Sequence, residues 1–155
     1  MYRIHIQNAT EQAFVPTVTE LRRWAKQTLQ KRIKSAELTI RIIDQAEMTR
    51  LNETFRHKKG PTNVLSFPFD ELEGVSFKVP PIGDLAICAD VVNREAAEQD
   101  KSAEAHWAHM VVHGVLHLLG YDHQEESEAE KMETEEIAIL QSFGFNDPYD
   151  LGSTP

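Results

Sequence analysis

The sequence predicts a single α+β domain in which helices pack on a small mixed β-sheet. Its 155 residues are 41% hydrophobic and 26% charged, which is enough for one hydrophobic core but not for two independent domains. Segments typical of strands and of helices follow one another in the order strand, helix, strand, helix, two strands and three helices. This order indicates helices layered on a sheet, in an α+β or α/β arrangement, with residues 1–155 forming one domain.

The first elements are a strand, a helix and a second strand. Residues 2–6 alternate apolar and polar side chains, as a half-buried strand does. From Val18 to Ile33 apolar residues recur every three or four positions, which predicts an amphipathic helix with Thr17 as its N-cap. Residues 37–43 are rich in β-branched side chains and predict the second strand.

A short helix and two further strands are expected next. Residues 45–55 have helical spacing, and Gly60 and Pro61 are expected to end that helix. Residues 62–69 and 83–90 predict two strands on either side of a loop that contains proline and glycine.

The last part of the chain predicts three helices. Residues 89–99 form the first, and residues 102–119 form a stronger one, with Ser102 as its N-cap and Gly120 at its end. Residues 125–143 predict a final helix, with Met132, Ile137, Leu140 and Phe143 on its apolar side. Seven glutamates and one lysine between residues 125 and 136 are typical of a solvated face.

Nothing in the sequence is typical of export or of a membrane span. The first residues do not combine a basic segment with an apolar one, and the longest mostly apolar stretch, residues 110–120, contains two histidines and is far shorter than the roughly 20 residues of a span. The single cysteine, Cys88, excludes an internal disulfide, and we interpret it as a small buried residue. We therefore expect a cytoplasmic protein with no membrane partner.

Three histidines have the spacing of a catalytic metal site. His113 and His117 lie one helical turn apart, and Gly120 can turn the chain back so that His123 joins them. Three imidazoles leave a fourth position open to water, which is typical of catalytic zinc, and a metal ion can activate a water or polarise a phosphoryl oxygen. We predict one Zn²⁺ per chain, although nickel or copper would accept the same ligands.

The segment HGVLHLLGYDH matches the zinc protease signature HExxHxxGxxH except at the general base, where Gly114 replaces glutamate. The spacing therefore keeps the metal ligands but lacks the protease base, which disfavours a zinc peptidase. His106 and His109 share the same helix face, and packing or support of the ligands is the favoured interpretation for both. The roles of Asp84 and Asp122 stay open.

A basic segment supplies candidate substrate contacts. Arg56, Lys58 and Lys59 precede a Gly-Pro turn, and such cations suit phosphate oxygens better than a peptide carbonyl. Arg56 is the predicted catalytic residue because a guanidinium can bind a phosphate with two hydrogen bonds. Lys58 and Lys59 are predicted to bind the substrate, and the alternative is an ordinary solvated loop.

Residues 56–70, 83–88 and 104–123 resemble the YbeY-type bacterial endoribonucleases, which are rRNA maturation factors. The resemblance implies an α+β fold with a metal helix reminiscent of zinc proteases, and zinc on His113, His117 and His123. It also implies that Arg56 acts in catalysis or RNA binding. The implied function is that of a metal-dependent endoribonuclease, specific for single strands, in 16S rRNA 3′-end maturation and ribosome quality control. The expected partners are small-subunit ribosomal RNA, small-subunit ribosomal proteins and an assembly GTPase.

The net charge of −9 by itself counts against an RNA partner. However, residues 1–60 hold 12 basic and 6 acidic side chains, whereas the rest of the chain holds 4 and 19. We therefore expect Arg56 and its basic neighbours to line the cleft of the three histidines, with the glutamates on another face. The main alternative is a non-catalytic assembly factor in which zinc only ties His123 to the helix.

Overall fold

The computed structural model describes residues 1–11, 14–70, 74–122 and 125–149. Four strands form one mixed sheet in the order β1-β2-β4-β3. The strands β1, β2 and β4 are parallel, and β3 runs antiparallel to β4. This mixed sheet confirms the predicted α+β class. The strand bounds are β1 Tyr2–Asn8, β2 Ala36–Ile43, β3 Val64–Pro68 and β4 Pro81–Cys88.

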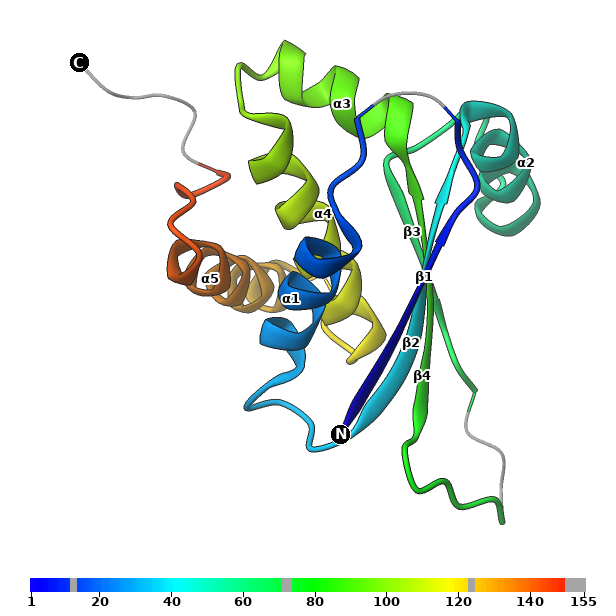
Figure 1. Ribbon diagram of the computed structural model, residues 1–155, viewed down its shortest axis with the longest axis vertical. Coiled ribbons are helices and arrows are strands. Elements are labelled where there is room, and N and C mark those ends of the chain that lie inside the picture. The colour runs from blue at the N-terminus through cyan, green and yellow to red at the C-terminus, as the bar shows by residue number, and fades with distance from the viewer. Residues whose placement is uncertain (12–13, 71–73, 123–124, 150–155) are drawn as a thin grey trace.

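Five helices surround the sheet within the described residues. In Figure 1, α1, α4 and α5 lie on one side of the sheet, and α2 lies on the other. The helix α4 carries the histidine row and packs between the sheet and α5, so both of its neighbours can hold its side chains in place. The helix bounds are α1 Val18–Leu29, α2 Gln45–Arg56, α3 Ala89–Glu98, α4 Ala103–Leu118 and α5 Glu126–Ser142.

The core fills the space between the sheet and α1 and α4. Trp24 on α1 and Trp107 on α4 are fully buried, together with aliphatic side chains of β2 and β4. Burial of apolar surface contributes roughly 25 cal/mol per Å², so these large side chains anchor α4 to the sheet. Cys88 is also fully buried, as expected, and burial raises the pKa of its thiol.

Both predicted N-caps are confirmed. The Thr17 side chain accepts a hydrogen bond from the Glu20 amide in a capping box, and the Ser102 side chain accepts one from the Ala105 amide. The helix α1 is shorter than predicted, because Gln30 leaves the helical conformation and Lys31 has a positive φ of 71°.

The prediction that Gly60 and Pro61 end α2 is wrong. The helix ends at Arg56, because His57 adopts the left-handed conformation with φ 56° and ψ 34°. The buried face of α5 also differs from the prediction: Ile137 is half-buried, whereas Met132, Glu136, Ile139 and Leu140 are buried. The acidic run is therefore not a uniformly solvated face.

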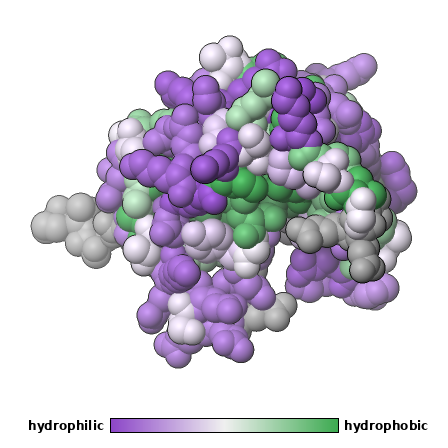
Figure 2. Space-filling model, turned by 90° about the horizontal axis from the view of Figure 1, so that it is seen from below, coloured by the Kyte–Doolittle hydropathy of each residue, from purple (hydrophilic) through white to green (hydrophobic). Residues whose placement is uncertain are grey.

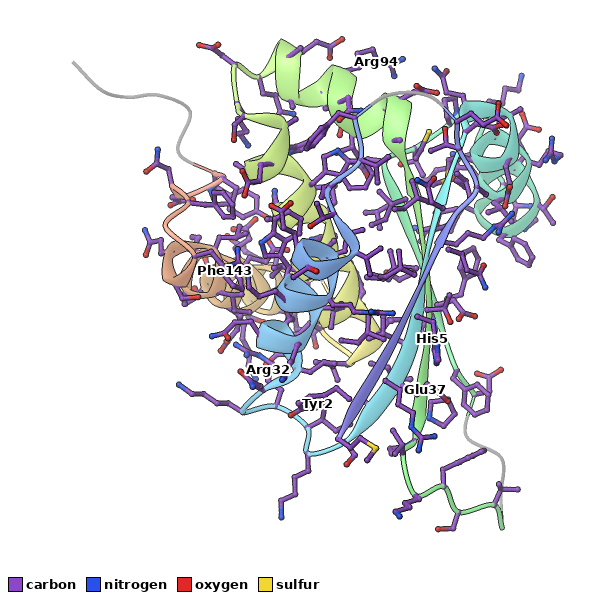
Figure 3. The ribbon with its side chains drawn as sticks, viewed as in Figure 1. Tyr2, His5, Arg32, Glu37, Arg94 and Phe143 are labelled. Carbon is purple, nitrogen blue, oxygen red and sulfur yellow. The ribbon has the colours of Figure 1, made fainter. Side chains whose placement is uncertain are left out.

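Contacts outside the core fix α1 and the edge of the sheet. Arg32, which follows α1, forms an ion pair with Glu135 of α5, and His5 on β1 lies 2.9 Å from Glu37 on β2 (Figure 3).

The connection from β3 to β4 carries Phe69 and Phe77, both exposed, with ring centroids 6.1 Å apart. Figure 2 shows this end of the molecule, where hydrophilic residues surround a band of hydrophobic ones.

Within the part of the chain that the structure describes, no helix has both the length and the apolar character needed to cross a membrane.

Candidate metal centre and adjoining cleft

Four histidines form a row along α4, as their spacing predicts. The ring centroids of His106 and His109, and of His109 and His113, are 6.1 Å apart, and those of His113 and His117 are 4.7 Å apart. Each pair meets edge to face. The row passes from the buried start of the helix to its more exposed end, so the two candidate ligands are the accessible members.

A buried carboxylate from α5 lies behind this row. Glu136 is fully buried and accepts hydrogen bonds from the Nδ1 of His113 and from the hydroxyl of Tyr149. Its Oε2 also lies 3.2 Å from the Nε2 of His109. Because the Nδ1–H of His113 donates a hydrogen bond to Glu136, the Nε2 of that ring is left as the nitrogen able to bind a metal.

Glu136 is negatively charged at neutral pH. Burial alone would raise its pKa, but hydrogen bonds from His109 and His113 lower it to about 2. Burial lowers the pKa of His109 despite the neighbouring carboxylate. Burial and the hydrogen bond to Glu136 both raise the pKa of Tyr149, so its hydroxyl stays protonated and donates.

The ligand atoms of His109, His113 and Glu136 lie within 4.8 Å of one another, close enough to hold a metal ion. This set shares only His113 with the predicted ligands. His113 and His117 line the cleft, and Glu136 contacts His113 from the side of α5. His123, the third predicted ligand, lies outside the described residues. Gly120 has a positive φ of 100°, and Tyr121 and Asp122 line the same cavity as His113 and His117.

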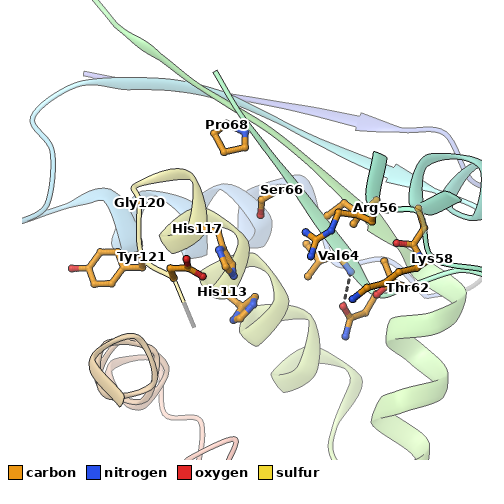
Figure 4. A pocket seen from close by; sticks show the side chains of 14 residues that line it. Arg56, Lys58, Thr62, Val64, Ser66, Pro68, His113, His117, Gly120 and Tyr121 are labelled. Carbon is orange, nitrogen blue, oxygen red and sulfur yellow. Dashed lines mark hydrogen bonds between the residues drawn. The ribbon is translucent and has the colours of Figure 1, made fainter. Parts of the chain in front are cut away.

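The cleft beside the histidines is a cavity of about 560 Å³ (Figure 4). Arg56 and Lys58 lie on one side of it, and His113 and His117 lie on another, with the strand β3 between them. Asp122 also lines the cavity, whereas Lys59 is exposed and is not among its lining residues. The predicted meeting of Arg56 and the histidines in one cleft is therefore observed, and their roles in catalysis and binding stay predictions.

Two amide side chains hold the basic segment and β3 in place, and sequence reasoning missed the first of them, Asn52. Asn52 is buried on α2, and its Nδ2 donates to the carbonyl of Gly60 at 2.9 Å. Asn63 donates to Oε1 of Glu95 at 3.0 Å, and the Nε2 of His106 lies 2.9 Å from the same oxygen. Glu95 thus links the start of β3 to α4.

The residue that replaces the protease base faces away from the cleft. A Cβ atom on Gly114 would lie 2.8 Å from Cδ2 of Leu85, which is fully buried. A glutamate at this position would point into the core between α4 and β4. The fold therefore excludes a protease-like general base here, and Gly114 serves the close approach of helix and sheet.

The fold and the site together define a class of protein: a small α+β domain whose central helix carries a histidine row beside a cleft lined by Arg56, Lys58 and Asp122, with His109, His113 and Glu136 close enough to hold a metal. The model of the family described as Endoribonuclease YbeY matches residues 5–144. The chain belongs to this family, which confirms the resemblance.

Individual relatives support the assignment. A protein named Endoribonuclease YbeY from Nitrosococcus oceani is 54% identical over 147 residues, which is 95% of this chain and 96% of the relative. A protein of the same name from Methylococcus capsulatus is 56% identical over 149 residues, 96% of each chain. A solution structure of a Thermotoga maritima protein, 24% identical, has the same fold, with a TM-score of 0.59 over 97% of this chain and 99% of that one.

Proposed function

We propose that the protein is a zinc-dependent endoribonuclease, specific for single strands, which acts in 16S rRNA 3′-end maturation and ribosome quality control. The observation that carries this proposal is the shared cavity of Arg56, Lys58, His113 and His117. Cations beside a metal-binding histidine pair suit a phosphodiester, because both can neutralise charge on its oxygens. The relatives named Endoribonuclease YbeY support the same activity.

In this proposal His113, His117 and His123 hold one Zn²⁺, and Glu136 fixes the orientation of His113. When bound, the metal supplies Lewis acidity and activation of water. The protein's own contribution is positional: Arg56 binds the phosphate with its guanidinium, and Lys58 holds the adjoining backbone. Small-subunit ribosomal RNA is the proposed partner, with small-subunit ribosomal proteins and an assembly GTPase as proposed protein partners in the cytoplasm.

Two other functions would use the same histidines. A zinc peptidase is disfavoured because the position of its base is filled by Gly114, which faces Leu85 in the core. A non-catalytic assembly factor would use the same histidines only to stabilise the fold. It would bind ribosomal RNA or proteins without cutting RNA, so loss of RNA cutting by a folded, zinc-loaded Arg56→Ala protein separates the two.

The test compares four preparations on a single-stranded and a structured RNA, each with and without chelator. They are the wild type, Arg56→Ala, His117→Ala and the control Arg50→Ala, which removes an exposed guanidinium from the same helix without touching the cavity. We expect Arg56→Ala to fold, to bind zinc and to cut RNA about 100-fold more slowly. We expect His117→Ala to lose zinc and activity, and Arg50→Ala to match the wild type. Equal cutting by all four would show a contaminating nuclease and would refute the proposal.

A further inference from the structure

The open edge of the sheet borders the cleft. The strand β3 is the last in the sheet order, and Val64, Ser66 and Pro68 line the cavity beside His113 and His117 (Figure 4). An edge strand presents main-chain groups that no neighbouring strand pairs with. The backbone of β3 is therefore a candidate for direct contact with whatever occupies the cleft.

The register shows which main-chain groups face outward. The Cys88 amide donates to the carbonyl of Asn63 at 2.9 Å, and the Phe69 amide donates to the carbonyl of Ile82 at 3.0 Å. Hydrogen bonding alternates along an antiparallel pair, so odd-numbered residues of β3 face β4 and even-numbered residues face the open edge. The N–H groups of Val64 and Ser66 thus point away from the sheet.

Only one of the outward donors is available in this stretch of β3. The N–H of Val64 donates to Oδ1 of its neighbour Asn63 at 2.6 Å, and Pro68 has no N–H. The remaining donor on the edge is the N–H of Ser66. The Ser66 side chain does not compete for it, because the Oγ of Ser66 donates to the carbonyl of Gly114 at 3.3 Å.

The surroundings of this N–H select an anion over a peptide. An extended peptide that pairs with an edge strand needs alternating donors and acceptors, and β3 offers one donor among several carbonyls. A phosphate oxygen needs a donor within a cationic environment, which Arg56 and Lys58 supply in the same cavity.

We propose that the main-chain N–H of Ser66 donates a hydrogen bond to a non-bridging oxygen of the phosphodiester that is cleaved. This inference rests on the proposed endoribonuclease function and adds a substrate contact to it. The Oγ of Ser66 donates to the carbonyl of Gly114, the residue after His113, and this bond holds the Ser66 N–H in place relative to α4. A preorganised main-chain donor of this kind stabilises charge that develops on the phosphate oxygens during cleavage.

The test removes the N–H and leaves the side chain in place. An amide-to-ester replacement at residue 66 deletes the donor, and the same replacement at residue 64 is the matched control, since its N–H is already bonded to Asn63. Ser66→Pro is a second way to delete the donor, at an outward position where proline is tolerated in edge strands. Ser66→Ala keeps the N–H and loses the contact to Gly114, so it measures how much of the Ser66→Pro effect comes from that contact alone.

We expect the ester at residue 66 and Ser66→Pro to cut a single-stranded oligoribonucleotide about 100-fold more slowly in kcat/KM than their controls, with zinc content unchanged. We also expect the two phosphorothioate stereoisomers of the scissile bond to be cut at different rates by the wild type, and the ratio of these rates to be smaller for the ester protein. Full activity of the folded, zinc-loaded ester protein would overturn the inference. The inference would also be overturned if the ester protein or Ser66→Pro cut RNA normally but bound an extended peptide more weakly, because the edge strand would then serve a protein partner. Failure of the wild type to cut RNA would instead refute the proposed function.

Discussion

Replacing Glu136 with glutamine tests whether a buried carboxylate controls the metal site. Glu136 is fully buried and contacts His109, His113 and Tyr149. Its pKa of about 2 means that Glu136→Gln removes a full negative charge at neutral pH while preserving the shape of the side chain. Any effect of this variant therefore comes from the lost charge and the lost acceptor oxygen, because the packing is unchanged.

Two magnitudes follow from these contacts. Loss of a carboxylate that orients a ligand histidine weakens metal binding by about 10- to 100-fold, which corresponds to roughly 1.4 to 2.8 kcal/mol. A hydrogen bond to a charged group contributes about 1.5 to 3 kcal/mol, and a glutamine amide cannot accept from all three partners. We therefore expect the free energy of unfolding of the metal-free protein to fall by about 2 kcal/mol.

The assay is competition for Zn²⁺ with a chromophoric chelator, together with urea unfolding of the metal-free protein. Glu130→Gln is the matched control, since it removes an exposed glutamate from the same helix. Zinc affinity equal to that of the control would refute the orienting role of Glu136. A loss well beyond 100-fold, with little effect of His117→Ala, would show that the metal lies among His109, His113 and Glu136 instead.

Three further predictions concern the scaffold. Gly114→Ala should destabilise the protein by about 1 to 3 kcal/mol in urea unfolding, despite the higher helix propensity of alanine, and Leu85→Ala in the same chain should reduce that cost; additive effects would contradict the contact. Thr17→Ala should lower the free energy of unfolding by about 1 kcal/mol through loss of the capping box, and an unchanged melting temperature would contradict it. Burial would raise the pKa of Glu95, but hydrogen bonds from His106 and Asn63 lower it below the ordinary value of 4.5. The carboxylate therefore stabilises the fold above pH 4.5 and loses this effect as the pH falls through its lower folded pKa, so Glu95→Gln should destabilise at pH 7 and converge with the wild type in acid.

Periodicity predicted the elements well because most of them have one buried face. It located the histidine row correctly, since spacings of three and four bring His106, His109, His113 and His117 onto one side of α4. Periodicity failed at the end of α2, where His57 adopts a left-handed conformation that is more common for glycine. Helix ends depend on such single-residue conformations, which spacing does not report.

The partners of the histidines were harder to predict, because they come from other parts of the chain. Glu136 is 23 residues from His113, and Glu95 is 11 residues from His106. A signal for Glu136 was nevertheless present: its position after Met132 and before Leu140 places it on the apolar side of α5. The run of exposed glutamates around it hid that position, so a charged residue at core spacing was read as part of a solvated face.

The acidity of the chain is compatible with an RNA substrate because charges act over short distances. At physiological ionic strength screening reduces interactions beyond about 8 Å, so the charges lining the cavity matter more than the net charge of −9. Arg56, Lys58 and Asp122 are the charged residues in that lining, and Glu136 of α5 contacts the histidine row from its buried side. If a divalent metal binds to neutral imidazoles here, Glu136 would cancel only part of its charge. In the proposed site, the buried acid would therefore strengthen His113 as a ligand while the cleft stays cationic, which is the charge arrangement that a phosphodiester requires.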